Sequence, residues 1–98
     1  ELQLSRQFIQ YTASFSLPNT KMRGLIFELQ PSFDPEEPLY SHPEEEILYV
    51  LEGSCLLTLE GKEYLLNPGD CVHIPANAPH SWKNPTAHTA KLFGAYCV

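Results

Sequence analysis

Two histidines and one glutamate form the set of residues in this chain that is best suited to bind a metal ion. His42 and Glu46 lie four residues apart, directly before the apolar run 47–51, and His80 follows the loop 76–79. Imidazole nitrogens and carboxylate oxygens bind divalent first-row metals, and two histidines with one carboxylate leave coordination positions open for other ligands. The set therefore predicts a site for one divalent ion of iron, manganese, nickel or zinc.

Backbone preferences around these residues indicate extended chain. Pro43 disfavours the helical region for His42, so His42 and Glu46 are not expected to share a helical turn. Alternate residues of a strand face the same side, which puts Glu46 in phase with the apolar residues two and four places on, and His80 in phase with Trp82. We therefore expect the three ligands to enter one interior. The side chains expected to line it are Leu48, Val50 and Trp82, with core packing as the alternative role of Trp82.

Two motifs in the chain resemble those of the cupin family. The first follows the pattern G-x5-H-x-H-x3-E-x6-G and is represented here by Tyr40, His42, Glu46 and Gly53. The second follows the pattern G-x5-P-x-G-x2-H-x3-N and is represented by Gly69, Pro75, Asn77, His80 and Asn84. The resemblance implies an all-β fold, a jelly-roll barrel of two antiparallel sheets, formed by a single domain over residues 1–98.

The chain departs from the cupin motifs at two positions. Asn77 replaces the internal glycine of the second motif, but asparagine tolerates a positive φ better than most residues, so we expect the turn to be kept. Tyr40 replaces the first histidine of the family's metal set. A neutral phenol with a pKa of about 10 is a poor ligand. Tyr40 is therefore expected as a fourth ligand or a hydrogen-bond donor beside the ion, or it leaves only three protein ligands. A further interpretation keeps the same residues as the lining of a metal-free pocket for an organic ligand.

Composition and charge limit the classes of protein that fit. The 98 residues suit one domain, and a hydrophobic content of 43% indicates a folded globule rather than a disordered tail. The net charge is −6, and half of the twelve acidic residues lie between Asp34 and Glu46. Because binding to nucleic acid requires a basic surface, we expect no direct contact of this domain with DNA or RNA. Glu44 and Glu45 are expected to be solvated charges at the rim of the site.

Membrane segments and disulfides are not expected. No apolar stretch approaches the roughly 20 residues of a membrane span, and no signal segment opens the chain, so we expect a cytoplasmic protein. The three cysteines, Cys55, Cys71 and Cys97, are odd in number and lack the C-x2-C spacing of thiolate metal sites. We expect buried free thiols.

Short runs of β-favouring residues, separated by proline and glycine, predict the strands of the barrel. The expected strands cover residues 7–15, 21–30, 47–51, 54–59, 62–66, 71–74 and 89–98. Residues 1–20, the first strand and its turn, are expected either to be exchanged between the subunits of a homodimer or to pair within their own sheet. His73 is out of phase with its apolar neighbours and is expected to face outward, while Tyr49 is expected in the core or in the pocket wall.

Two functions from different classes fit these residues. Segments 46–53 and 79–85 closely resemble the C-terminal cupin of bacterial helix-turn-helix regulators, which implies that a small molecule in the barrel would control a separate DNA-binding domain. A chain that begins at Glu1 would suit a fragment of such a regulator. The alternative is a mononuclear non-haem metal enzyme of the dioxygenase, epoxidase or isomerase type, in which the ion would activate dioxygen or polarise a substrate oxygen.

Overall fold

The computed structural model describes residues 2–3, 8–12, 18–35 and 41–98, and every regular element in these ranges is a β-strand. The strands are Leu2–Gln3 (β1), Phe8–Thr12 (β2), Met22–Leu29 (β3), Glu46–Glu52 (β4), Cys55–Leu59 (β5), Lys62–Leu66 (β6), Cys71–Ile74 (β7), His80–Lys83 (β8) and Ala90–Cys97 (β9). From β3 onward, the strands that were expected begin and end within one residue of their predicted limits. Part of the predicted strand 7–15 lies outside the described residues. The described ranges contain no helix that could cross a membrane.

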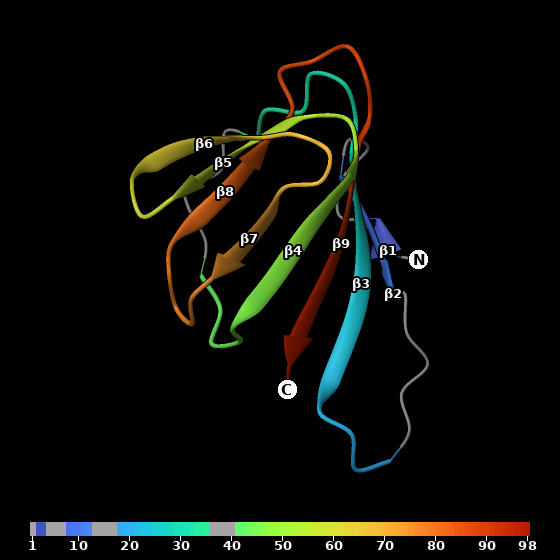
Figure 1. Ribbon diagram of the computed structural model, residues 1–98, viewed down its shortest axis with the longest axis vertical. Coiled ribbons are helices and arrows are strands. Elements are labelled where there is room, and N and C mark those ends of the chain that lie inside the picture. The colour runs from blue at the N-terminus through green and yellow to red at the C-terminus, as the bar shows by residue number, and fades with distance from the viewer. Residues whose placement is uncertain (1, 4–7, 13–17, 36–40) are drawn as a thin grey trace.

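The strands form two antiparallel sheets that face each other (Figure 1). The larger sheet has the order β1-β2-β3-β9-β4-β7, and the smaller one has the order β6-β5-β8. Strand β9, the last in the chain, pairs with β3 on one side and with β4 on the other. Strand β2 pairs with β3 of the same chain. The expected all-β jelly-roll architecture is confirmed.

Strand β4 shows how the sequence directs side chains to the two faces of the larger sheet. Glu46, Leu48 and Val50 are buried, whereas Ile47 and Tyr49 between them are exposed. This alternation is the geometric consequence of a pleated strand, in which neighbouring side chains point to opposite faces. The predicted inward phase of the glutamate is thus confirmed. The expectation for Tyr49 is wrong, because its phase places it on the outer face with 44% exposure.

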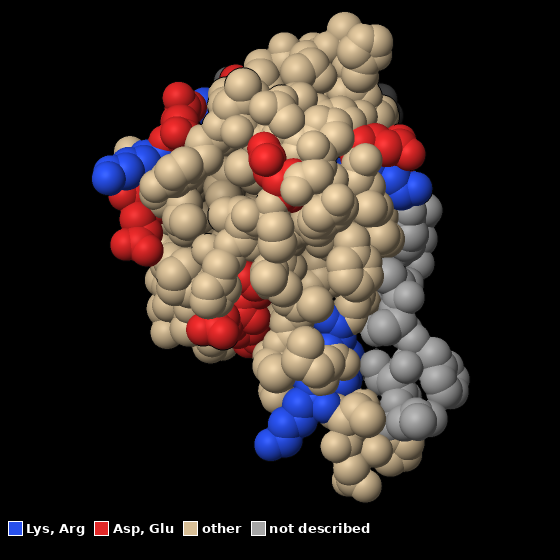
Figure 2. Space-filling model, in the orientation of Figure 1, with Lys and Arg blue, Asp and Glu red and all other residues tan. Residues whose placement is uncertain are grey.

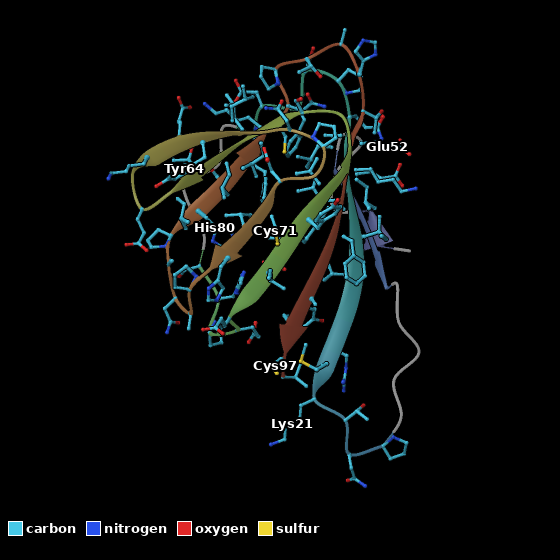
Figure 3. All side chains as sticks on the ribbon, in the orientation of Figure 1. Lys21, Glu52, Tyr64, Cys71, His80 and Cys97 are labelled. Carbon is cyan, nitrogen blue, oxygen red and sulfur yellow. The ribbon has the colours of Figure 1, made fainter. Side chains whose placement is uncertain are left out.

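Between the sheets, one continuous apolar core forms. It is built from inward-facing residues of both sheets together with two residues of the connecting loops: Leu29, Phe33, Leu48, Val50, Cys55, Leu57, Leu66, Ile74, Ala78, Trp82, Ala90 and Leu92. Cys55 is fully buried there, but Cys71 on β7 and Cys97 at the end of β9 are exposed (Figure 3). The expectation of three buried thiols is therefore wrong for two of them, since both occupy outward-facing strand positions.

Tight turns connect the strands as their residues predict. The hairpin between β5 and β6 turns at Glu60 and Gly61, with φ values of 50° and 83°, the two positive angles of a type I′ turn. Asn77 has a φ of 64°, which confirms that asparagine keeps the turn where the motif has glycine. Asp70 accepts a 2.7 Å hydrogen bond from the backbone N–H of Asn67 and caps the turn before β7. Gly53 has a φ of 70°, and a Cβ there would lie 2.4 Å from the carbonyl oxygen of Thr89, so this position requires glycine.

Candidate metal centre

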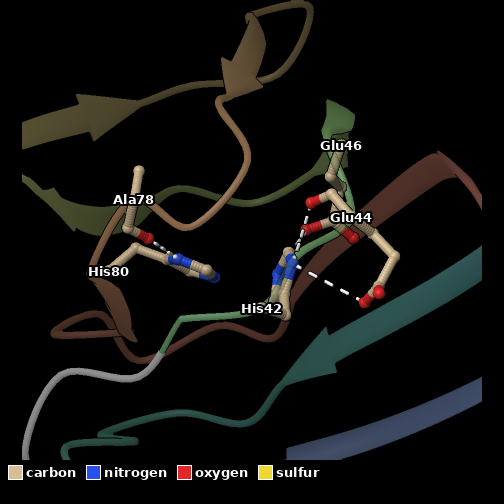
Figure 4. Close-up of polar contacts among 5 residues, drawn as sticks. All are labelled: His42, Glu44, Glu46, Ala78 and His80. Atoms are coloured by element: carbon tan, nitrogen blue, oxygen red, sulfur yellow. Dashed lines mark hydrogen bonds and ion pairs between the residues drawn. The ribbon is translucent and has the colours of Figure 1, made fainter.

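The structure brings the three predicted ligands together at one end of the barrel (Figure 4). Glu46 is the first residue of β4 in the larger sheet, and His80 is the first residue of β8 in the smaller one. His42 lies in the segment that leads into β4. Candidate ligand atoms of the three side chains all lie within 4.8 Å of one another. Residues that are 38 positions apart in the chain thus meet because the two sheets face each other.

A backbone hydrogen bond ties the two ligand-bearing segments to each other. The N–H of Asn77 donates to the carbonyl oxygen of His42 at 2.8 Å. Asn77 belongs to the left-handed turn that precedes His80, and His42 belongs to the loop before β4. Asn77, which stands where the motif has glycine, therefore also helps to fix the position of His80 relative to His42.

Hydrogen bonds to backbone carbonyls set the orientation of both imidazole rings. His42 Nδ1 lies 2.9 Å from the carbonyl oxygen of Glu44, and His80 Nδ1 lies 2.9 Å from that of Ala78. A carbonyl oxygen only accepts hydrogen bonds, so Nδ1 carries the proton in the neutral form of each ring. Nε2 is then the nitrogen available to a metal in both rings. A ligand histidine whose other nitrogen donates to a carbonyl is the usual arrangement in metal sites.

The distances agree with a ligand set that closes slightly around an ion. His42 Nε2 lies 3.6 Å from Glu46 Oε1, and the two imidazole rings meet edge to face with centroids 4.9 Å apart. Ligand atoms at 2.0–2.2 Å from one ion lie roughly 3–4 Å from each other. Small side-chain rotations therefore bring the set to coordination distance, and the residues present fit a divalent ion.

Burial acts on the charge state of the two ligands that face the interior. Burial raises the pKa of Glu46, an effect that His42 opposes and the nearby Glu44 strengthens. Burial lowers the pKa of His80, whereas its hydrogen bond to Ala78 acts in the opposite direction and His42 lowers it further. Burial therefore disfavours the ionised form of each of these two side chains in the metal-free protein. A divalent cation between them would favour the ionised glutamate and the neutral histidine, which is the form that ligates.

The remaining predicted site residues fall into two groups. Leu48, Val50 and Trp82 lie in phase with the ligands on the inner faces, are at most 4% exposed and pack in the core cluster. Their contact with a bound ligand stays a prediction. Tyr40 lies outside the described residues, so its role beside the ion also stays a prediction.

Acidic residues near the ligands lie at the rim, as expected. The Glu45 side chain is 65% exposed and pairs with His73 at 3.4 Å, which confirms that His73 faces outward. The Glu44 carboxylate lies 4.0 Å from His42 Nδ1 and is 36% exposed. Neither glutamate belongs to the group of three converging ligands.

Two residues that the sequence analysis did not single out lie in the same row as Glu46. Tyr96 of β9 is directly opposite Glu46 in the register, and Arg23 of β3 is directly opposite Tyr96. Both are half-buried. The signal that could have found Arg23 is its phase, which matches the buried Leu25 and Leu29 of the same strand.

Comparison with known proteins identifies the family. Residues 25–97 match the cupin domain family. The chain belongs to the cupin family. Over 79 residues this cupin is 33% identical to the HTH-type transcriptional regulator PuuR of Escherichia coli, a match that covers 81% of this chain and 42% of the regulator. Over 55 residues it is 40% identical to quercetin 2,3-dioxygenase of Bacillus subtilis, covering 56% of this chain and 16% of the dioxygenase. The cupin thus spans less than half the length of either relative.

Solved structures share the same fold. The cupin domain of an XRE family transcriptional regulator from Enterobacter cloacae superposes with a TM-score of 0.81 over 95% of this chain and 98% of that chain, at 15% identity. The polyketide cyclase RemF from Streptomyces resistomycificus superposes with a TM-score of 0.78 over 94% of this chain and 66% of that chain, at 24% identity. One of these proteins is a regulator and the other an enzyme, so fold alone does not choose between the two functions.

Proposed function

We propose that this cupin binds one divalent metal ion through His42, Glu46 and His80, and that it holds a small molecule at the open positions of that ion. The observation that carries the proposal is the convergence of the three side chains from both sheets, with candidate ligand atoms within 4.8 Å. When bound, the ion would act as a Lewis acid toward an oxygen atom of the small molecule. The protein itself orients the two imidazoles and supplies the anionic carboxylate.

We assign the small-molecule site to effector sensing in a bacterial transcriptional regulator. The support is the identity of 33% to PuuR over 81% of this chain, which involves less than half of that regulator. The cupin itself is not expected to contact DNA, because Lys and Arg are few and stand apart on the face seen in Figure 2 instead of forming a basic stripe. A sensor of this kind would work in the cytoplasm, beside the DNA that its regulator controls.

Metal content tests the first half of the proposal. Protein purified without chelator, or loaded with Mn²⁺, should contain about one ion per chain, because three buried or half-buried ligands converge. His80→Ala should lower the affinity for Mn²⁺ by at least a hundredfold. His73→Ala is the matched control, since His73 is exposed on the outer face and should leave metal binding unchanged. Absence of metal in wild-type protein under every loading condition would overturn the proposal.

A metal enzyme is the second candidate, and the identity of 40% to quercetin 2,3-dioxygenase favours it. The two functions differ in turnover. An enzyme of this kind would consume dioxygen when quercetin or a related compound is added to the iron- or manganese-loaded protein, and His80→Ala would abolish the consumption. A sensor would bind its effector without consuming it.

We also propose that the domain assembles as a homodimer. The outer face of the larger sheet exposes the apolar side chains Ile47, Tyr49, Leu51 and Phe93, each at 40% or more, and Tyr49 lies opposite Phe93 in the register. A second copy packed on this face by a two-fold axis would remove the patch from water. Sedimentation should show a dimer for the wild type and a shift toward monomer for Tyr49→Glu. A monomeric wild type at all concentrations would contradict the dimer.

A further inference from the structure

Two sulfur-bearing side chains lie against each other on the outer face of the larger sheet. The chain has one methionine and three cysteines, and the structure places Met22 beside Cys97 as register partners of β3 and β9. Figure 3 shows Cys97 at the end of β9, beside Lys21, which precedes β3. Cys97 Sγ donates a hydrogen bond to Met22 Sδ, with the two sulfur atoms 3.3 Å apart. The thiol proton therefore lies between two sulfur atoms, where a soft cation would also be bound.

This sulfur pair is separate from the candidate metal centre and from the apolar patch proposed for dimerisation. Cys97 has the phase of the exposed Phe93, whereas Glu46 is buried on the inner face, so the sheet separates the sulfur atoms from the candidate ligands. Phe93 lies four residues before Cys97 on β9, a distance of about 14 Å along the strand. Met22 is 60% exposed and Cys97 is exposed, so an ion in solution can reach both sulfur atoms.

Hydrogen bonds to the backbone fix the two strand ends that carry the pair. The N–H of Val98 donates to the carbonyl oxygen of Lys21 at 2.8 Å, directly next to the two sulfur-bearing residues. Arg23 Nη1 donates to the carbonyl oxygens of Thr20 and Met22, each at 3.0 Å. The backbone is therefore held on both sides of the pair. The methionine side chain, with three rotatable bonds, can still adjust the distance between the sulfur atoms.

The donor atoms determine which cation fits. Thiolate and thioether sulfur are soft ligands that suit Cu⁺, whereas Mn²⁺, Mg²⁺ and Ca²⁺ prefer oxygen. Zn²⁺ requires a tetrahedral set, and among the described residues Cys97 belongs to no group of three or more His, Cys, Asp and Glu side chains that could hold it. Cu⁺ is stable with two sulfur ligands. At a metal–sulfur distance of about 2.3 Å the two sulfur atoms lie at most about 4.6 Å apart, so the observed 3.3 Å has to open by roughly 1 Å.

We infer that Met22 and Cys97 form a second metal site, which binds one Cu⁺ ion between the thioether and the thiolate. On binding, the S–H bond of Cys97 breaks, its proton passes to solvent and a Cu–S bond forms in its place. The Met22 sulfur donates a lone pair to the same ion. Copper and sulfur keep their oxidation states. The site goes beyond the proposed function and does not depend on it, because it shares no residue with the candidate metal centre.

Competition for Cu⁺ tests the inference on the full chain. Protein with reduced thiols is titrated without oxygen against Cu⁺ held by the coloured chelator bicinchoninate, and the loss of colour measures the transfer of the ion. The wild type should take up one ion per chain. Met22→Leu removes only the sulfur ligand from an exposed side chain and should lower the affinity at least tenfold. Cys97→Ser removes the anionic ligand and should lower it at least a hundredfold.

Cys71 provides a matched control within the same chain. It is also an exposed thiol of the larger sheet, but its register partner on β4 is Tyr49 instead of a methionine. Cys71→Ser should therefore leave the uptake of Cu⁺ unchanged. One equivalent of Cu⁺ should protect Cys97, but not Cys71, from iodoacetamide, as measured by mass spectrometry of digested protein. Met22→Leu should remove this preference and leave the binding of Mn²⁺ unchanged.

The outcomes separate this site from the proposed function. Failure of the wild type to take up Cu⁺, equal affinity in wild type and Met22→Leu, or equal protection of Cys71 and Cys97 would each overturn the inference. The last two results would mean that any exposed thiol of the chain binds the ion equally well. Absence of Mn²⁺ binding would overturn the proposed function and leave this inference standing. Uptake of one Cu⁺ ion that depends on both Met22 and Cys97 supports it.

Discussion

The two ends of β8 carry two polar residues of the same sequence motif, and their surroundings differ. Asn84, directly after the strand, is fully buried, and its carboxamide donates to the carbonyl oxygens of Leu29 and His88, at 2.8 Å each. Its Oδ1 accepts from Thr86 N and Thr86 Oγ1 at 3.0 and 2.7 Å. His80 at the other end is equally buried, but its ring faces two further side chains with metal-binding atoms.

This difference separates a structural residue from a functional one. A carboxamide has two donors and two acceptor positions, so four hydrogen bonds leave Asn84 nothing for a ligand. It clamps the loop 84–88 to β3. His80, by contrast, sits beside a buried carboxylate whose pKa burial raises, an arrangement that costs folding free energy unless a cation is present. The Asn84 end of β8 therefore stabilises the barrel, and the His80 end belongs to a site that a bound cation would stabilise.

The largest effect that we expect is a loss of stability when the Asn84 end of β8 is changed. Asn84→Ala should lower the free energy of unfolding by about 3 kcal/mol, because it leaves the buried carbonyl of Leu29 and two part-buried backbone groups of the loop 84–88 without their Asn84 partner. Thr86→Val removes one of the four bonds to Asn84 together with two exposed bonds between Thr86 Oγ1 and the backbone of His88, and it should cost about 1 kcal/mol. Chemical denaturation measures both. If Asn84→Ala keeps wild-type stability but loses Mn²⁺ binding, the assignment of the two ends is reversed.

Metal loading should stabilise the protein through the His80 end. At a free Mn²⁺ concentration one hundred times the dissociation constant, the gain in unfolding free energy is about 2.7 kcal/mol. The thermal midpoint should therefore rise by at least several degrees in wild type and in Thr86→Val, and should not change in His80→Ala. Differential scanning calorimetry with and without chelator measures this. An equal rise in His80→Ala would show that the ion binds elsewhere.

Glu46→Gln should have opposite effects with and without metal. Burial raises the pKa of Glu46, so its ionised form opposes folding at neutral pH. Glutamine keeps the shape without the charge, and the metal-free variant should therefore melt at a higher temperature than the wild type at pH 7. The advantage should fade as the pH falls through the raised pKa of folded Glu46 toward the ordinary value of 4.5, because Glu46 of the wild type is then increasingly protonated in the folded state and no longer carries the buried charge. With Mn²⁺ present the order should reverse. A metal-free variant less stable than the wild type would contradict the cost assigned to the buried charge.

Cysteine labelling gives the smallest and most local effect. Cys55 precedes Leu56 on β5, and Leu56 pairs with Lys83 of β8. Cys55 therefore lies at the Asn84 end of the core. It is fully buried, and burial raises the pKa of its thiol to about 11. Iodoacetamide at pH 8 should modify the exposed Cys71 and Cys97 and spare Cys55, and Asn84→Ala should accelerate the labelling of Cys55 alone. Mass spectrometry of digested protein measures each site. Equal rates at all three thiols in the wild type would refute the described packing.

Local sequence rules predicted most of the fold and the ligand set. Proline and glycine marked the turns, and hydrophobic runs located the strands from β3 onward, except β8, to within one residue of their observed limits. The same alternation correctly directed Glu46 inward and His73 outward. The expectation of burial failed for the exposed thiols Cys71 and Cys97. It rested on the general preference of cysteine for the interior, whereas the phase of each strand decides which face a side chain occupies.

By itself, the sequence determined which residues could act as ligands, which positions turn and which side chains alternate on each strand, because these depend on neighbours a few residues apart. Only the tertiary structure decided that His42, Glu46 and His80 meet, which nitrogen of each ring faces the others, and that Arg23 and Tyr96 stand in the row of Glu46. Those relations depend on the register of β3, β9 and β4 and on the facing of two sheets. Such pairings join segments far apart in the chain, and no local rule can specify them.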